Sequence, residues 1–129
     1  RGAGRGKPRL SVSTADDPLQ CLFTTGFAYE DWVIETNLAH FNRFQRLSQG
    51  VRRLGSAALD LCYVAAGRVD GYWEVSVYPW DLAAGGLIAA EAGALVTNVR
   101  GGPDYLTRPC SILAANPALH ARMLAELSA

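Results

Sequence analysis

The carboxylate with the most suggestive chemical setting in this sequence is Asp81, which follows an apolar strand pattern and a proline. The spacing predicts a helix over residues 81–92, with Asp81 as its N-cap and Gly93 as its C-terminal stop. A capping aspartate alone is a structural element. Two features favour a further role: Trp80, which we expect to be buried, ends a strand where α/β proteins gather ligands, and the small residues that follow leave room for close approach.

A second candidate is the junction Gly55-Ser56-Ala57, where a strand pattern gives way to a helix pattern. Backbone N–H groups exposed at such a junction can bind anionic or hydroxylated ligands. The alternative for Ser56 is a plain helix N-cap. A nucleophilic serine is not favoured, because His40 and His120 both lie in other predicted helices and neither is paired with it by sequence.

A third candidate is Glu74, which ends an aromatic-rich strand pattern shortly before Asp81. Their separation lets the strand end and the helix start border one pocket, where a carboxylate can accept paired hydrogen bonds from adjacent hydroxyls. The alternative is a solvated charge at a strand end. The remaining acids of this region are interpreted as structural: Asp60 inside a helix, Asp70 at a turn and Glu91 in a last helical turn.

Length and composition restrict the class of protein. A chain of 129 residues with 50% hydrophobic residues suffices for one globular domain. Twelve basic and twelve acidic residues cancel, so no net field favours nucleic acid. No apolar run approaches the roughly 20 residues that cross a bilayer, which argues against a membrane partner. The three cysteines, Cys21, Cys62 and Cys110, lack zinc-site spacing and predict reduced, core-filling residues of a cytoplasmic protein.

Strand and helix patterns alternate along the chain. Strands are predicted over residues 9–13, 20–24, 51–54, 69–77, 94–98 and 111–115, and helices over residues 30–45, 57–66, 81–92 and 117–127. In the first helix the spacing places Val33, Ile34, Leu38 and Phe41 on one apolar face and Asn37 toward water. This alternation predicts an α/β layer structure with a largely parallel sheet.

Three parts of the chain together resemble the inositol monophosphatase family. The family's second signature is similar to Trp80-Asp81 with Ala83-Ala84-Gly85 and Glu91-Ala92-Gly93. Its substrate-binding segment is similar to residues 52–74. Its closing segments are similar to Gly101-Gly102-Pro103 and Ile112-Leu113-Ala114-Ala115-Asn116. The resemblance implies that residues 1–129 form a single domain, the C-terminal half of a layered αβαβα sandwich.

The resemblance also implies a role for each candidate residue. Members of the family hydrolyse phosphate monoesters with Mg²⁺, so Asp81 is implied as the metal ligand contributed by this half. Gly55, Ser56, Ala57 and Glu74 are implied as contacts to the small-molecule substrate. The expected protein is therefore a magnesium-dependent phosphomonoesterase acting on inositol 1-phosphate or a related sugar phosphate, assembled as a homodimer.

One part of the family pattern is missing from the sequence. The first signature, Asp-Pro-x-Asp-Gly-Thr, and the Glu-Glu pair that precedes it in the family do not occur. Residues 1–8 also look compressed relative to the family's glycine-rich turn. We therefore expect a C-terminal half that is inactive without its N-terminal half. The alternative is a non-catalytic module that binds polyol or phosphate, or regulates, without a metal half.

Overall fold

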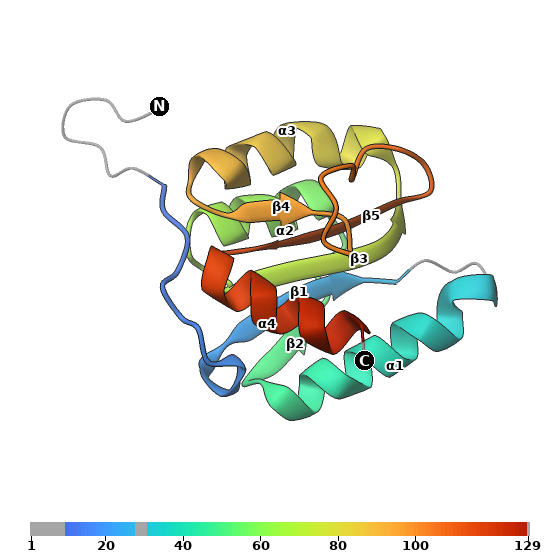
Figure 1. The fold of residues 1–129 in the computed structure, drawn as a ribbon, viewed down its shortest axis with the longest axis horizontal. Helices are drawn as coiled ribbons and strands as arrows, with labels where there is room; N and C mark the ends of the chain where they lie inside the picture. Colours follow the sequence, from blue (N-terminus) through green and yellow to red (C-terminus); the bar gives the residue numbers. More distant parts are fainter. Residues whose placement is uncertain (1–9, 28–30, 129) are drawn as a thin grey trace.

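A computed structural model of the chain describes residues 10–27 and 31–128. The elements follow one another as a short 3-10 helix η1 (Pro18–Gln20), β1 (Leu22–Gly26), α1 (Asp31–Leu47), β2 (Gly50–Arg52), α2 (Ala57–Ala65), β3 (Gly71–Val77), α3 (Pro79–Glu91), β4 (Leu95–Thr97), β5 (Cys110–Ala115) and α4 (Pro117–Ser128). Strands and helices alternate as the sequence predicts, so the α/β layer architecture is confirmed (Figure 1).

The five strands form a mixed sheet in the order β2-β1-β3-β5-β4. β1 pairs in parallel with β2 and with β3, whereas β5 pairs antiparallel with both β3 and β4. Four strands therefore run in one direction and β5 alone runs against them. The largely parallel prediction misses β5, because the loop over residues 98–109 turns the chain back as a hairpin connection instead of a helical crossover.

Helices cover both faces of the sheet, α2 and α3 on one face and α1 and α4 on the other (Figure 1). Neighbouring residues of β3 serve opposite faces, because side chains alternate along a strand. Tyr72 joins the α2/α3 core with Leu61 and Leu82, and Trp73 joins the α1/α4 core. The sheet is thus the middle layer of three, and its two cores are separate.

Several predicted elements differ from the structure. The predicted strand over residues 9–13 is absent from its described part, where Val12 donates one backbone hydrogen bond to Ala92 and packs against the α2/α3 core. Its described residues, 10–13, lie beside the end of α3 and are not part of the five-stranded sheet. The basic opening, residues 1–8, lies outside the described residues.

Helix α1 exposes and buries different residues from those predicted. Val33 is buried as expected, and Ile34 and Phe41 are half-buried, but Leu38 is exposed. Asn37, which we expected to face water, is buried. The buried face of α1 is therefore rotated relative to the apolar spacing, and packing against β2 and α4 decides which side is covered.

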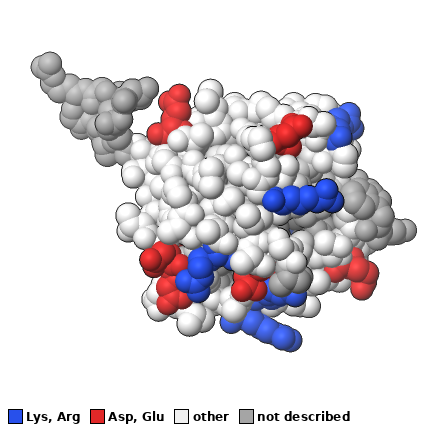
Figure 2. Space-filling model, in the orientation of Figure 1, with Lys and Arg blue, Asp and Glu red and all other residues white. Residues whose placement is uncertain are grey.

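The structure also shows the state of the three cysteines, the character of the helices and the distribution of charge. Cys21 and Cys110 are buried and Cys62 is half-buried, and all three are free thiols. None of the helices in residues 31–128 is long and apolar enough to span a bilayer. Figure 2 shows acidic and basic side chains interspersed over one face of the molecule, without a continuous patch of either sign on that face.

Candidate functional site

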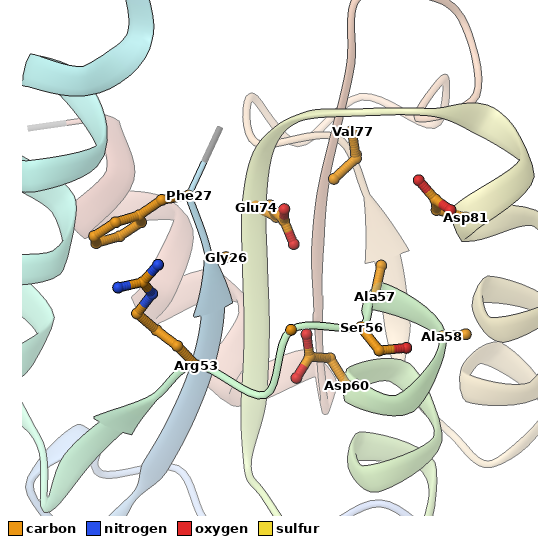
Figure 3. A pocket seen from close by; sticks show the side chains of 11 residues that line it. Gly26, Phe27, Arg53, Ser56, Ala57, Ala58, Asp60, Glu74, Val77 and Asp81 are labelled. Carbon is orange, nitrogen blue, oxygen red and sulfur yellow. The ribbon is translucent and has the colours of Figure 1, made fainter. Parts of the chain in front are cut away.

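A pocket of about 620 Å³ lies beyond the carboxyl ends of the parallel strands β1, β2 and β3 (Figure 3). In sheets of this class ligands collect at that edge, because the loops leaving the strands open there. The pocket brings together all five residues singled out in the sequence: Gly55, Ser56, Ala57, Glu74 and Asp81.

The start of α2 forms one wall of the pocket. Gly55 has a φ of 81°, a left-handed conformation that favours glycine, and it turns the chain from β2 into the helix. Ser56 is the N-cap of α2, and its hydroxyl accepts a hydrogen bond from the Leu59 N–H at 3.2 Å. The capping role is therefore confirmed, and the same residue lines the pocket. The two interpretations of Ser56 are compatible.

Asp81 enters the pocket from α3, but it is not the helix cap. The helix begins at Pro79 with Tyr78 as its N-cap, because proline needs no N–H partner in the first turn. Asp81 lies in the first turn, where the helix dipole favours a negative charge. Its carboxylate is directed toward the pocket instead (Figure 3).

Trp80 differs from its predicted position. Instead of being buried it is 70% exposed, and its ring stacks on Tyr78 with centroids 4.8 Å apart. At Gly85 the small residue allows close packing of α3 on α2, since a side-chain carbon added there would lie 2.9 Å from Leu61. The expectation of a buried Trp80 is thus wrong, whereas the close approach expected at the small residues occurs, with α2 at Gly85. Asp81 itself lies in the pocket.

Glu74 is positioned by two neighbours, Tyr72 and Gly26. The Tyr72 hydroxyl donates a 2.6 Å hydrogen bond to its Oε1 atom. Gly26 pairs with it across β1 and β3, and a side-chain carbon at Gly26 would lie 2.6 Å from the carboxylate. Burial raises the pKa of Glu74; the Tyr72 bond lowers it and the charge of Asp81 raises it further. Gly26 therefore provides the space in which Glu74 lies, a role that the sequence interpretation missed.

Asp60 belongs to the same pocket, although the sequence interpretation treated it as structural. It is 1% exposed, and its Oδ1 atom has no hydrogen-bond partner in the described part of the chain. Burial, followed by the charge of Glu74, raises its pKa to about 7, with a smaller lowering from the Thr24 hydroxyl. One signal was available: Asp60 falls at the helical spacing of the buried residues Leu61 and Val64, where a charge is unexpected.

A basic group completes the lining. The Arg53 guanidinium lies 4.3 Å from the centre of the Phe27 ring, and both residues line the pocket. The sequence interpretation did not single out either residue. Its only available signal was the position of Arg53 directly before the turn that leads to Gly55.

The family model for inositol monophosphatases matches residues 1–129 of this chain. The chain belongs to the inositol monophosphatase family. Nus factor SuhB of Pasteurella multocida is 47% identical over 115 residues, covering 88% of this chain and 43% of that relative. Inositol-1-monophosphatase of Synechocystis sp. is 42% identical over 129 residues, covering 99% of this chain and 45% of that relative.

Solved structures of the family share the fold. The extragenic suppressor protein suhB from Bartonella henselae superimposes with a TM-score of 0.88 at 38% identity, covering 95% of this chain and 47% of that chain. The sequence resemblance and the layered α/β fold are therefore confirmed. The chain spans slightly less than half the length of these relatives.

The pocket of this inositol monophosphatase family member has the donor chemistry of a magnesium site without the full ligand set. Oxygen ligands suit Mg²⁺, which commonly takes one or two carboxylates and keeps several waters. Asp60, Glu74 and Asp81 leave the pocket rich in carboxylates. Within residues 10–27 and 31–128, however, no three His, Cys, Asp or Glu side chains are arranged to hold a metal ion. The described residues therefore fit such an ion as a partial ligand set.

Proposed function

We propose that this chain carries part of the active site of a magnesium-dependent phosphomonoesterase acting on inositol 1-phosphate or a related sugar phosphate. The observation that supports this function is the convergence of Asp81, Glu74 and the start of α2 in one pocket. Relatives with similar identity have the names Nus factor and inositol-1-monophosphatase, so similarity alone does not choose between them. A pocket with polyol-type acceptors and an anion-binding helix start favours the second.

Each residue has a distinct task in this proposal. Asp81 would hold Mg²⁺, which when bound supplies Lewis-acid stabilisation of the charge on the phosphate oxygens. The N–H groups at the start of α2, at Ser56 and Ala57, bind the phosphate or a ring hydroxyl. The Ser56 hydroxyl accepts from Leu59 within α2 and can donate its own proton to the ligand. Glu74 accepts hydrogen bonds from adjacent hydroxyls and so orients the polyol.

The activity and assembly of the whole protein are also proposed, because this chain matches slightly less than half the length of the relatives described above. We propose that an N-terminal half supplies the remaining metal ligands and that the protein is a cytoplasmic homodimer. Residues 1–129 without that half are expected to release no phosphate. The second candidate, a non-catalytic module that binds polyol or phosphate, is favoured by the incomplete ligand set among the described residues.

The substitution Asp81→Asn in the intact protein separates these candidates. It removes a charge without changing shape, so we expect the free energy of unfolding to change by less than about 0.5 kcal/mol. Phosphate release from inositol 1-phosphate is expected to fall by about a hundredfold or more, even at saturating magnesium. Asp16→Asn, an exposed aspartate far from the pocket in the sequence, is the matched control and is expected to retain wild-type turnover.

Two results would contradict the enzyme proposal. Near wild-type turnover in the Asp81→Asn variant would leave that residue without a metal role. Absence of magnesium-dependent phosphate release from the intact wild-type protein, with inositol phosphate still bound, would favour the non-catalytic module.

A further inference from the structure

Strand β3 contains one residue more than regular pairing with β5 allows. Val75 and Val77, which are two residues apart in β3, lie opposite adjacent residues of β5. Ser76 between them is the extra residue of this register shift. Its φ of 69° lies in the left-handed region, which is uncommon for a residue other than glycine. Ser76 is therefore the inserted residue of a β-bulge, a feature that often redirects a side chain next to an active site.

The bulge changes which side chains of β3 face the pocket. Regular alternation would place Ser76 on the same side of the sheet as Glu74, and Val77 on the opposite side. Instead, Val77 lies opposite Cys110 and belongs with it to the α2/α3 core. The bulge thus places an isopropyl group on the pocket side of the sheet, where regular pairing would place a hydroxyl group.

Val77 lines the pocket together with the candidate site residues. Its side chain is 9% exposed and shares the lining with Glu74 and Asp81. Figure 3 shows Val77 between these two carboxylates and directed into the pocket. The start of α2 adds the small side chains of Ala57 and Ala58 to the same lining. An apolar surface therefore lies between the two carboxylates.

We propose that Val77 determines specificity by packing against the C–H groups of the substrate ring, between the hydroxyls that bind Glu74 and the phosphate held near Asp81. This inference rests on the proposed function, which assigns those two ends of the substrate. A polyol ring has apolar C–H groups between its hydroxyls, and ligand pockets combine a few polar groups with apolar contact area. The substrate class is thereby narrowed to phosphate esters of a cyclic polyol, because an acyclic polyol presents no ring face to Val77.

The substitution Val77→Thr tests this contact, because threonine keeps the branched shape and replaces one methyl group with a hydroxyl group. In the intact protein at saturating magnesium, KM for inositol 1-phosphate should rise about fourfold at unchanged kcat, since apolar contact with the ring is lost. KM for glycerol 2-phosphate, which has two hydroxyls but no ring, should change less than twofold. Val75→Thr is the matched control: this half-buried neighbour of the bulge lies outside the pocket lining, and the variant should leave both KM values unchanged.

A measurement on the wild-type protein separates failure of this inference from failure of the proposed function, and it does not depend on how a variant folds. Inositol, which has no ester to hydrolyse, is added with inorganic phosphate and magnesium, and should shift the methyl resonances of Val77 but not those of Val75. If the wild type hydrolyses neither ester but the Val77 resonances shift, the proposed function fails and the ring contact stands. Equal changes in KM for the two esters, equal effects of the two valine variants, or no selective shift at Val77 would overturn the role of Val77.

Discussion

The two faces of strand β3 treat their buried side chains in opposite ways. On the α1/α4 side, Trp73 stacks on Phe44 with centroids 4.3 Å apart, and Phe23 meets Phe44 edge to face at 5.2 Å. On the α2/α3 side, Tyr72 and Glu74 share a hydrogen bond, and Asp60 is buried beside them with an unpartnered oxygen. One face gains stability from apolar packing, and the other keeps desolvated polar groups available for a ligand.

This contrast explains how a short strand can support both a core and a site. Side chains alternate along β3, so consecutive residues lie on opposite sides of the sheet, one in the aromatic core and the next toward the pocket. A β-bulge between Val75 and Val77, with Ser76 at a φ of 69°, then ends the regular pairing close to the pocket. Bulges of this kind redirect the chain at the rim of a sheet.

The largest expected effect comes from the apolar face. Trp73→Ala should lower the free energy of unfolding of the intact protein by about 3 to 5 kcal/mol, because it removes a ring that is 1% exposed and leaves a cavity. Denaturation with urea measures this loss. Trp80→Ala, at an exposed tryptophan, is the control and should cost less than about 1 kcal/mol. Equal losses from the two variants would remove the contrast between the faces.

The second effect concerns Asp60 on the pocket face. The folded state keeps its proton up to a pKa of about 7, whereas the unfolded chain releases it near the ordinary value of 3.8. The folded state therefore binds more protons between these values, and the stability that Asp60 contributes is lost as pH rises through that window. Asp60→Asn removes this loss, so the variant should gain about 2 to 4 kcal/mol relative to wild type between pH 4 and pH 8.

Urea unfolding at several pH values measures this relative gain. Glu35→Gln, at an exposed acid of α1, should follow the wild-type pH dependence. A difference in the free energy of unfolding between Asp60→Asn and wild type that stays constant with pH would mean that Asp60 is ionised in the folded state throughout this range. Burying Asp60 on the α2/α3 side of β3 would then cost little stability.

The smallest effect concerns recognition by Glu74. Glu74→Gln preserves the shape and one acceptor but weakens charge-assisted hydrogen bonds to adjacent hydroxyls, by about 1 to 3 kcal/mol. We expect kcat/KM for inositol 1-phosphate to fall accordingly. An aryl phosphate, which has no ring hydroxyls, should be hydrolysed at nearly the wild-type rate. Equal losses for both esters would assign Glu74 to the metal site or the fold instead of the polyol.

Much of the fold follows from local patterns, and the exceptions have identifiable causes. Alternation of apolar residues and cap signals locate α2, whose Ser56 cap is confirmed. The start of α3 was misplaced because Asp81 and Pro79 are both suitable at a helix start, and the proline sets the boundary. The reversed direction of β5 depends on how a long loop closes, which composition alone does not specify.

The candidate site was predictable only where the family motifs mark it. Asp81, Glu74 and Ser56 lie in recognisable segments, and the structure places all three in one pocket. Asp60 was missed because its environment depends on Thr24 of β1 and Glu74 of β3. Arg53 was missed because its place in the lining depends on how the end of β2 meets Phe27, which follows β1. A helical aspartate has the same local pattern whether it faces water or a buried carboxylate, so tertiary contacts decide between them.

The Tyr72 hydroxyl keeps one oxygen of Glu74 engaged. Burial and the neighbouring carboxylates raise the pKa of this phenol above its ordinary value, so it remains a donor throughout the physiological range. The two oxygens of Glu74 therefore differ: Oε2 can accept its full number of hydrogen bonds, whereas Oε1 already accepts one from Tyr72. Such an asymmetric acceptor binds a pair of ring hydroxyls better in one orientation than in the other. We expect Glu74 to bind mirror-image cyclitols with different affinities, because of a hydrogen bond from Tyr72, which itself lies outside the pocket lining.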